Sequence, residues 1–178
     1  MIRGLVRLGL AGAAAAYAVD RALGWGAREP APVRSLVVID ASIQRVWAVV
    51  VDIEGQPRWM REMKSVRLLT PGPVGVGTVG EAEVRILGIG VTDPVTITEF
   101  SPPTRFAIRH DGRFSGTGVI TLEPGADGTT TIVRWDETLV PPFFPHLGAR
   151  VQGPVLGAIF QTDLRRLKAL LETDSTAS

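Results

Sequence analysis

Two side chains in the second half of the chain are of the types that carry out acid–base chemistry. His110 ends the run TRFAIRH and Glu137 lies in the run TTTIVRWDETLV, and both runs alternate apolar and polar residues as half-buried strands do. If Phe106 and Ile108 face the interior, His110 does so too, and an inward Trp135 implies an inward Glu137. Within reach of one substrate, an imidazole and a carboxyl group would supply the base and the acid for a cyclisation or a dehydration.

A structural interpretation of the same two residues competes with the catalytic one, and we favour it. His110 is followed by Asp111 and Gly112, which is typical of a strand end in solvent, and Glu137 would then pair with a nearby arginine at a cavity mouth. Nothing in the sequence shows that the two groups meet. We therefore assign no catalytic residue, keep Glu137 and His110 as weak candidates, and expect a protein that is not an enzyme.

The residue inventory argues against several other kinds of site. Cysteine is absent, which removes disulfides, thiolate nucleophiles and cysteine metal ligands. His110 and His146 are not at the spacing of a ligand pair, so we assign no metal and expect no cofactor. The 19 Lys and Arg residues against 18 Asp and Glu give a net charge of +1, which argues against a nucleic-acid partner.

The run GVGTVG at positions 75–80 has the glycine spacing of a dinucleotide-binding turn. Such a turn needs a helix after it, because the phosphates bind at the positive end of that helix. The residues that follow, EAEVRILGIGV, alternate as a strand does. We predict a turn between two strands and no nucleotide site.

The pattern of the remaining body predicts one strand, two short helices, six more strands and one long helix. The first strand covers residues 33–40, Ser42 caps the first helix, and Pro57 begins the second. No helix interrupts the later strands, which indicates a strongly curved antiparallel sheet. These six strands are SVRLL, GEAEVRIL, DPVTITEF, TRFAIRH, GTGVITLE and TTTIVRWDETLV.

The last predicted element is a long amphipathic helix, kinked or irregular near Gly153 and Pro154. Its apolar face consists of Leu147, Val151, Val155 and Ile159, continued by Phe160, Leu164, Leu167 and Leu171. If Gly116, Gly118, Gly153 and Gly157 all face inward, the side chains are too small to fill the space between sheet and helix, so we predict a cavity there. The residues expected to line it are Trp59, Phe106, Ile108, Phe114, Ile120, Trp135, Glu137, Val151, Val155 and Ile159.

Residues 1–24 form a separate hydrophobic helix, which a linker at 25–32 joins to the body at 33–172; a disordered tail at 173–178 ends the chain. The uncharged stretch from Leu8 to Val19 would cover only about 18 Å as a helix, less than the roughly 30 Å hydrocarbon core of a bilayer. We expect an uncleaved, membrane-associated helix, with the cytoplasmic side favoured over secretion. A soluble helix and a cleaved secretory signal are the alternatives.

The order of these elements, with VW in the first short helix, PRW in the second and ITEFSPPTRFAI across a strand junction, resembles the polyketide cyclase and dehydrase family of the START-like (SRPBCC) superfamily. The resemblance covers Val33 to Glu172, and Pro102-Pro103 and GPVGVG are its most specific parts. It implies an α+β helix-grip fold, in which a curved antiparallel sheet wraps the long C-terminal helix and leaves a hydrophobic cavity.

Members of this superfamily include aromatase-cyclases, lipid carriers and hormone receptors, so the resemblance indicates the fold better than the activity. The leading expectation is binding of a small hydrophobic or lipid-like ligand without catalysis, with the N-terminal helix at a membrane or a membrane protein. One alternative is a polyketide cyclase- or dehydratase-like enzyme that uses Glu137 and His110. The other is an accessory subunit of a membrane complex.

Overall fold

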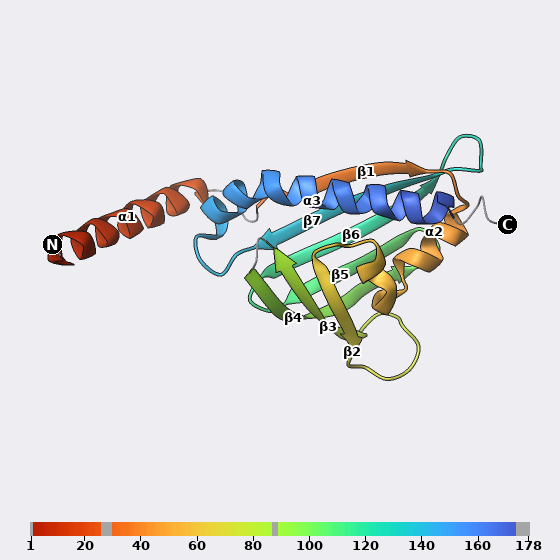
Figure 1. Cartoon of the computed structure of the whole chain (residues 1–178), viewed down its shortest axis with the longest axis horizontal. Coiled ribbons are helices and arrows are strands. Elements are labelled where there is room, and N and C mark those ends of the chain that lie inside the picture. The colour runs from red at the N-terminus through yellow and green to blue at the C-terminus, as the bar shows by residue number, and fades with distance from the viewer. Residues whose placement is uncertain (1, 26–29, 87–88, 174–178) are drawn as a thin grey trace.

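Seven strands form one curved antiparallel sheet in the order β1-β7-β6-β5-β4-β3-β2 (Figure 1). The computed structural model describes residues 2–25, 30–86 and 89–173. The strands are β1 (Val33–Ile39), β2 (Met63–Leu68), β3 (Val79–Ile86), β4 (Ile89–Ser101), β5 (Arg105–Asp111), β6 (Ser115–Pro124) and β7 (Thr131–Val140). This sheet and the long helix packed on it confirm the predicted helix-grip fold.

Four helical segments accompany the sheet: α1 (Ile2–Leu23), α2 (Ile43–Val50), the 3-10 helix η1 (Ile53–Arg58) and α3 (Pro145–Thr173). The prediction that the second short helix begins at Pro57 was wrong, because this helix begins at Ile53 and contains Pro57. Asp52 starts it, since its side chain accepts a hydrogen bond from the backbone N–H of Gly55.

The glycine-rich run at 75–80 connects β2 to β3. Gly77 has a φ of 88°, in the left-handed region that favours glycine, and β3 begins at Val79. A strand therefore follows the turn where a nucleotide site needs a helix, as predicted.

The strand register sorts the side chains of the sheet into rows. Residues paired directly across neighbouring strands lie on the same face of the sheet. The ring centroids of Trp135 on β7 and Phe160 on α3 are 4.6 Å apart, so the row of Trp135 lies on the concave face that α3 covers. This row consists of Ser35, Trp135, Ile120, Phe106 and Phe100.

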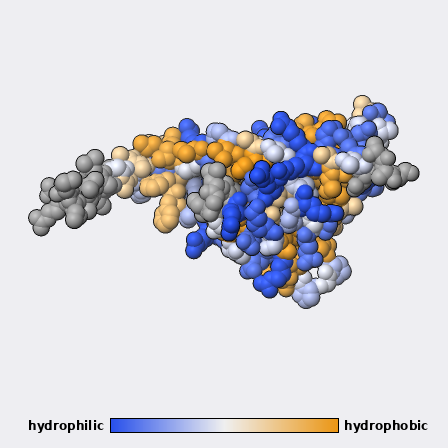
Figure 2. All heavy atoms as spheres, viewed as in Figure 1, coloured by the Kyte–Doolittle hydropathy of each residue, from blue (hydrophilic) through white to orange (hydrophobic). Residues whose placement is uncertain are grey.

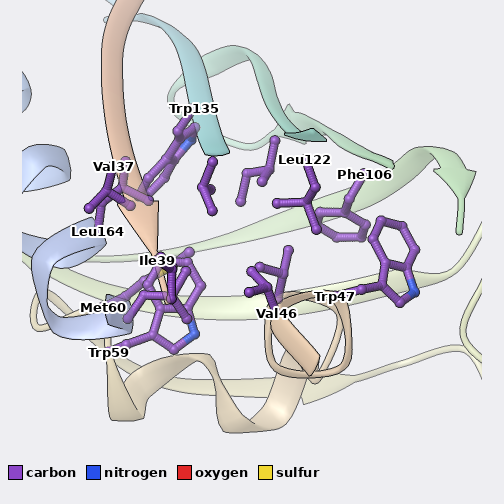
Figure 3. Packing of buried hydrophobic residues seen from close by; sticks show 14 of the residues in the cluster. Val37, Ile39, Val46, Trp47, Trp59, Met60, Phe106, Leu122, Trp135 and Leu164 are labelled. Carbon is purple, nitrogen blue, oxygen red and sulfur yellow. The ribbon is translucent and has the colours of Figure 1, made fainter. Parts of the chain in front are cut away.

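Aromatic rings fill the middle of the concave face. Trp59, which follows η1, is fully buried, and its ring packs edge-on against that of Trp135 at 6.0 Å. Further along the sheet, Trp47 of α2 packs edge-on against Phe100 at 5.4 Å. Figure 3 shows buried side chains of α2, α3, the sheet and the segment after η1 meeting in one cluster.

Polar side chains of α3 cover the outer edge of β1. An edge strand has backbone N–H and C=O groups that no neighbouring strand satisfies. Three side chains of α3 bind such groups here: Gln161 binds Leu36, Lys168 binds Val38, and Glu172 binds Asp40. The helix thereby closes this edge of the sheet to other strands as well as burying its apolar face.

Helix α1 extends away from the sheet and meets the body at the start of α3 (Figure 1). Asp20 makes the junction, because its Oδ1 accepts hydrogen bonds from the backbone N–H groups of His146 and Leu147, each at 2.8 Å. Within the described residues, none of the helices combines the length and the hydrophobicity needed to cross a bilayer. Residues 26–29 of the predicted linker and 174–178 of the predicted tail lie outside the described part of the chain.

Candidate functional site

The two weak catalytic candidates meet on the concave face. Nε2 of His110 on β5 lies 2.6 Å from Oε1 of Glu137 on β7. These strands are not neighbours, because β6 runs between them. The contact therefore crosses a whole strand, which is an unusual reach for two side chains of one sheet face.

Two glycines of β6 make this contact feasible. His110 is paired with Gly116, and Glu137 is paired with Gly118, so the middle strand places no side chain between the two groups. A Cβ atom at Gly118 would lie 2.5 Å from Oε2 of Glu137, and one at Gly116 would lie 1.9 Å from the backbone oxygen of Thr138. Gly118 faces inward, as predicted, but the Glu137 carboxylate occupies the space that we had assigned to a cavity there. At Gly116, with a φ of 139°, a Cβ atom would instead point at the backbone of β7.

A third side chain completes the cluster. The indole Nε1–H of Trp135 donates a hydrogen bond of 2.8 Å to Oε2 of Glu137. Each carboxylate oxygen of Glu137 thus has its own partner, which offsets the cost of burying this group. We name His110, Trp135 and Glu137 the polar cluster.

The polar cluster fixes which atoms of His110 can do chemistry. When Glu137 is ionised, Oε1 accepts from Nε2–H of His110, so the neutral imidazole carries its lone pair on Nδ1. A carboxylate that orients an imidazole in this way is the arrangement by which a histidine acts as a general base. The same groups can instead hydrogen-bond a hydroxyl or carbonyl group of a bound molecule.

The structural interpretation that we favoured for these residues was wrong in its details. The side chain of Glu137 is only 4% exposed and its partners are His110 and Trp135, with no arginine among the contacts of the described residues. The His110 side chain is 19% exposed, so it lies at a half-open position and not at a solvated strand end. An arginine does pair with Asp111, the next residue: Arg109 lowers the pKa of the Asp111 carboxyl group by hydrogen-bonding to it.

Most residues predicted to line the cavity do lie on or beside the concave face. Ile108 lies in the same cross-strand row as Glu137 and is half-buried. Leu139 of β7 and Ile159 of α3 are also half-buried. Phe114 lies in the turn between β5 and β6, where its N–H donates to Asp93. The fully covered members are Trp59, Phe106, Ile120, Trp135 and Glu137. Their role in binding a ligand stays a prediction.

Two of the predicted lining residues point the wrong way. Val151 is 69% exposed and Val155 is 43% exposed, so neither faces the sheet. The buried positions of α3 are Leu156, Phe160, Asp163, Leu164, Leu167 and Leu171. Steps of four residues advance 40° beyond a full turn, so the predicted series from Leu147 to Ile159 drifted off the inward face. Counting back four residues from Phe160 would have found Leu156.

Aromatic rings pack together under the middle of α3, and two hollows among the described residues lie elsewhere. A shallow groove of about 470 Å³ lies beside the C-terminal half of α3, next to Arg58, Arg166 and Thr173. A second pocket, of about 620 Å³, lies between α1 and the start of α3. Neither lies between the sheet and α3 at the aromatic cluster. His110, Ile108 and Leu139 are only half-buried, so the concave face is partly open beside the aromatic rings. The deep cavity stays a prediction.

Sequence reasoning missed one buried carboxyl group, Asp163. It lies on the inward face of α3 with 3% exposure, and its Oδ1 accepts a hydrogen bond from the backbone N–H of Arg61. Burial raises the pKa of Asp163 to about 6, and the nearby Glu62 adds to this effect. The signal was present in the spacing, because position 163 falls between the apolar positions 160, 164 and 167. Among the described residues, no three His, Cys, Asp or Glu side chains gather as metal ligands would.

Comparison with known proteins agrees with this architecture. A crystal structure from Thermus thermophilus superposes with a TM-score of 0.65 at 20% identity, over 81% of this chain and 99% of that one. The Zhui aromatase/cyclase of a Streptomyces species superposes with a TM-score of 0.62 at 17% identity, over 79% and 93% of the two chains. No curated protein has a significantly similar sequence. The family model described as polyketide cyclase/dehydrase and lipid transport matches residues 31–172, so the chain belongs to that family.

Proposed function

We propose that the protein binds a small, mainly apolar ligand that carries one polar group, and that it does not transform this ligand. The polar cluster carries this proposal. It sits in a predominantly apolar face, and His110 is the member that a bound molecule can reach. Selective sites of this kind combine an apolar lining with a few placed hydrogen-bonding groups. The family to which the chain belongs supports a hydrophobic or lipid-like ligand.

The packing of the concave face supports one position for such a ligand. Trp59, Trp135 and Phe160 occupy the space beneath the middle of α3. Ile108 and Leu139 are only half-buried and flank the polar cluster. The ligand's apolar part therefore packs on these two side chains, with its polar group directed towards His110.

Titration with a dansyl-labelled fatty acid tests the proposal. We expect saturable binding that Leu139→Trp abolishes in a protein that stays folded, because the indole occupies the ligand's volume. Val38→Trp is the matched control, since Val38 lies on β1 outside the proposed site and is 45% exposed. Unsaturable binding, or equal binding by both variants, would contradict the site.

A catalytic function is the second candidate, and the 2.6 Å contact between His110 and Glu137 favours it. In this alternative, Nδ1 of His110 removes a proton from the carbon beside a carbonyl group, and Glu137 stabilises the imidazolium that forms. Incubation with a poly-β-ketone thioester would then give a cyclised or dehydrated product. Turnover should depend on pH and collapse in Glu137→Gln, whereas a carrier gives no product with either protein.

We also propose that α1 associates with a membrane surface. Its support is the exposure of apolar side chains on a helix that extends away from the domain (Figure 1). A soluble helix that docks only on its own domain, or on a partner subunit, is the alternative. Sedimentation of the whole protein with lipid vesicles separates these cases.

A further inference from the structure

We propose that α1 and the first half of α3 together form one surface that binds a bilayer containing anionic lipids. This inference rests on the proposed membrane association and adds to it a second helix and a headgroup class. The docking surface is defined by two exposed arginines and five exposed apolar residues: Arg21, Arg150, Tyr17, Trp25, Phe143, Val151 and Val155.

The apolar residues of this surface are exposed to an extent that the fold does not require. Trp25 is 90% exposed, Phe143 78% and Tyr17 61%. Figure 2 shows hydrophobic side chains gathered over the C-terminal part of α1 and the first half of α3, whereas hydrophilic side chains dominate the rest of that view. A contiguous apolar area of this kind marks an interaction site in a folded protein. Tryptophan and tyrosine in particular favour the interface between headgroups and acyl chains.

The charges of the same two segments have one sign. The sequence of α1 contains three arginines, Arg3, Arg7 and Arg21, and one acid, Asp20. Residues 145–160 of α3 contain Arg150 and no acid. Because Asp20 is 5% exposed and bonded to the start of α3, it contributes little negative charge to the surface. The charge that remains is complementary to anionic headgroups.

Asp20 also sets the two helices in a fixed relation. Its two hydrogen bonds to the backbone of His146 and Leu147 tie the C-terminal turns of α1 to the first turn of α3. The pocket of about 620 Å³ lies at this junction and is lined by Tyr17, Arg21, Trp25 and His146 among others. Aromatic rings and Arg21 thus line a hollow at the edge of which lies the Asp20 carboxyl group, whose Oδ1 already accepts two hydrogen bonds from α3. We infer that a lipid headgroup enters there while the apolar side chains lie among the acyl chains.

Flotation of the full chain with two kinds of vesicle tests the headgroup class. One kind is phosphatidylcholine alone, and the other is phosphatidylcholine with phosphatidylglycerol. We expect binding to the anionic vesicles that weakens with added salt, and little binding to the neutral ones. Each basic residue near an anionic surface contributes about five-fold in affinity, so Arg21→Gln with Arg150→Gln should weaken binding about thirty-fold.

The matched control removes the same charge elsewhere. Arg134→Gln with Arg165→Gln changes two exposed arginines outside the docking surface, and position 165 lies about 22 Å along α3 from Arg150. An equal loss in both double variants would show that only net charge matters and would overturn the surface. Equal binding to both kinds of vesicle would overturn the headgroup class but leave membrane association standing. Absence of binding to either kind of vesicle would contradict both the headgroup class and the membrane association, and the proposed ligand site would be unaffected.

The contribution of α3 is tested with valines. Val151→Asp places a charge where the surface is inferred to enter the bilayer, and we expect it to reduce vesicle binding at least ten-fold. Val38→Asp is the control, because Val38 is also exposed, at 45% against 69% for Val151, but lies on β1. If the two variants bind alike while deletion of α1 abolishes binding, α1 acts alone and the composite surface is wrong. Circular dichroism of each variant confirms that its fold is retained.

Discussion

A Cβ atom added to Gly118 would lie 2.5 Å from Oε2 of Glu137, nearer than real Cβ contacts come. The absence of a side chain at this position lets a carboxylate from β7 reach an imidazole on β5 across β6. A glycine in a strand interior is otherwise a weakening choice, because it has no side chain to pack. Gly118 is therefore best explained by the space that the polar cluster requires.

Gly118→Ala should accordingly destabilise the protein by about 1–3 kcal/mol, the usual cost of overpacking a filled site. The φ of Gly118 is not in the left-handed region, so the effect comes from the contact with Glu137 and not from backbone strain. Urea unfolding measures the change. Gly157→Ala is the control: its Cβ atom would lie 3.5 Å from Cγ1 of Val33, an ordinary contact, and the change in the middle of α3 should gain roughly 0.5–1 kcal/mol from helix propensity. A neutral Gly118→Ala would mean that Glu137 can leave its site freely.

Glu137→Ala should cost more than Glu137→Gln. The alanine leaves the buried Nε1–H of Trp135 without an acceptor, and an unsatisfied buried donor costs about 1–3 kcal/mol. The glutamine retains an oxygen that can accept from Trp135, so most of that loss should be avoided. Urea unfolding at one pH compares the two. Equal losses would show that the hydrogen bond to Trp135 does not stabilise the fold.

The sheet was predictable from the sequence because its pattern is local. The strands on either side of each turn alternate apolar and polar residues, and this alternation placed Phe106, Trp135 and Glu137 on one face. The meeting of His110 with Glu137 was not predictable, because it depends on the pairing of three strands and on their register. Only that register reveals that two glycines lie between the two side chains.

The inward face of α3 and its contact with α1 were harder to predict than the sheet. The length of α3 was apparent from its composition, but its inward face depends on a phase that accumulates along 29 residues. Starting the series at Leu147 put Val151 and Val155 inside, whereas the structure places Leu156 there, next to the correctly predicted Phe160. The long-range cap from Asp20 has no local signal at all, since it joins residues more than a hundred positions apart.

Phe160→Ala tests the corrected face of α3. The ring packs against Trp135 at 4.6 Å and is 8% exposed, so its removal should cost about 3–5 kcal/mol. Val155→Ala should change stability by no more than about 0.5 kcal/mol, because that side chain is largely in solvent. Thermal or urea unfolding of both variants decides the matter. A larger loss for Val155→Ala than for Phe160→Ala would mean that Val155 faces the sheet, as the sequence predicted.

Asp163→Asn should change how stability depends on pH. The pKa of Asp163 is raised from 3.8 to about 6 by burial, so between those values the folded protein binds more protons at this group than the unfolded chain. The contribution of Asp163 to the free energy of unfolding of the wild type therefore falls as pH rises from about 4 to about 6, and it is constant above that pH. Asparagine does not titrate and can still accept from the Arg61 N–H.

The difference between the two proteins isolates this group from Glu62, Arg166 and the other charges around it. Urea unfolding at several pH values between about 4 and 7 should show the Asn variant gaining on the wild type as pH rises. A constant difference across that range would mean that the carboxyl group titrates alike in both states. A widening difference in the opposite direction would mean that the hydrogen bond from Arg61 outweighs the cost of burial.

Asp20→Ala should destabilise the start of α3, although the substitution lies in a different helix. Oδ1 of Asp20 satisfies two of the N–H groups that the first turn of any helix leaves unpaired, and its charge faces the positive end of α3. Loss of such a cap costs about 0.5–2 kcal/mol. Val19→Ala, at the exposed neighbouring position, should have little effect.

Deletion of residues 1–28 should then leave a cooperatively folding domain whose loss of stability matches that of Asp20→Ala, because the cap is what the domain loses. A much larger loss on deletion would show that α1 belongs to the core, and no loss in either variant would show that water caps α3 equally well.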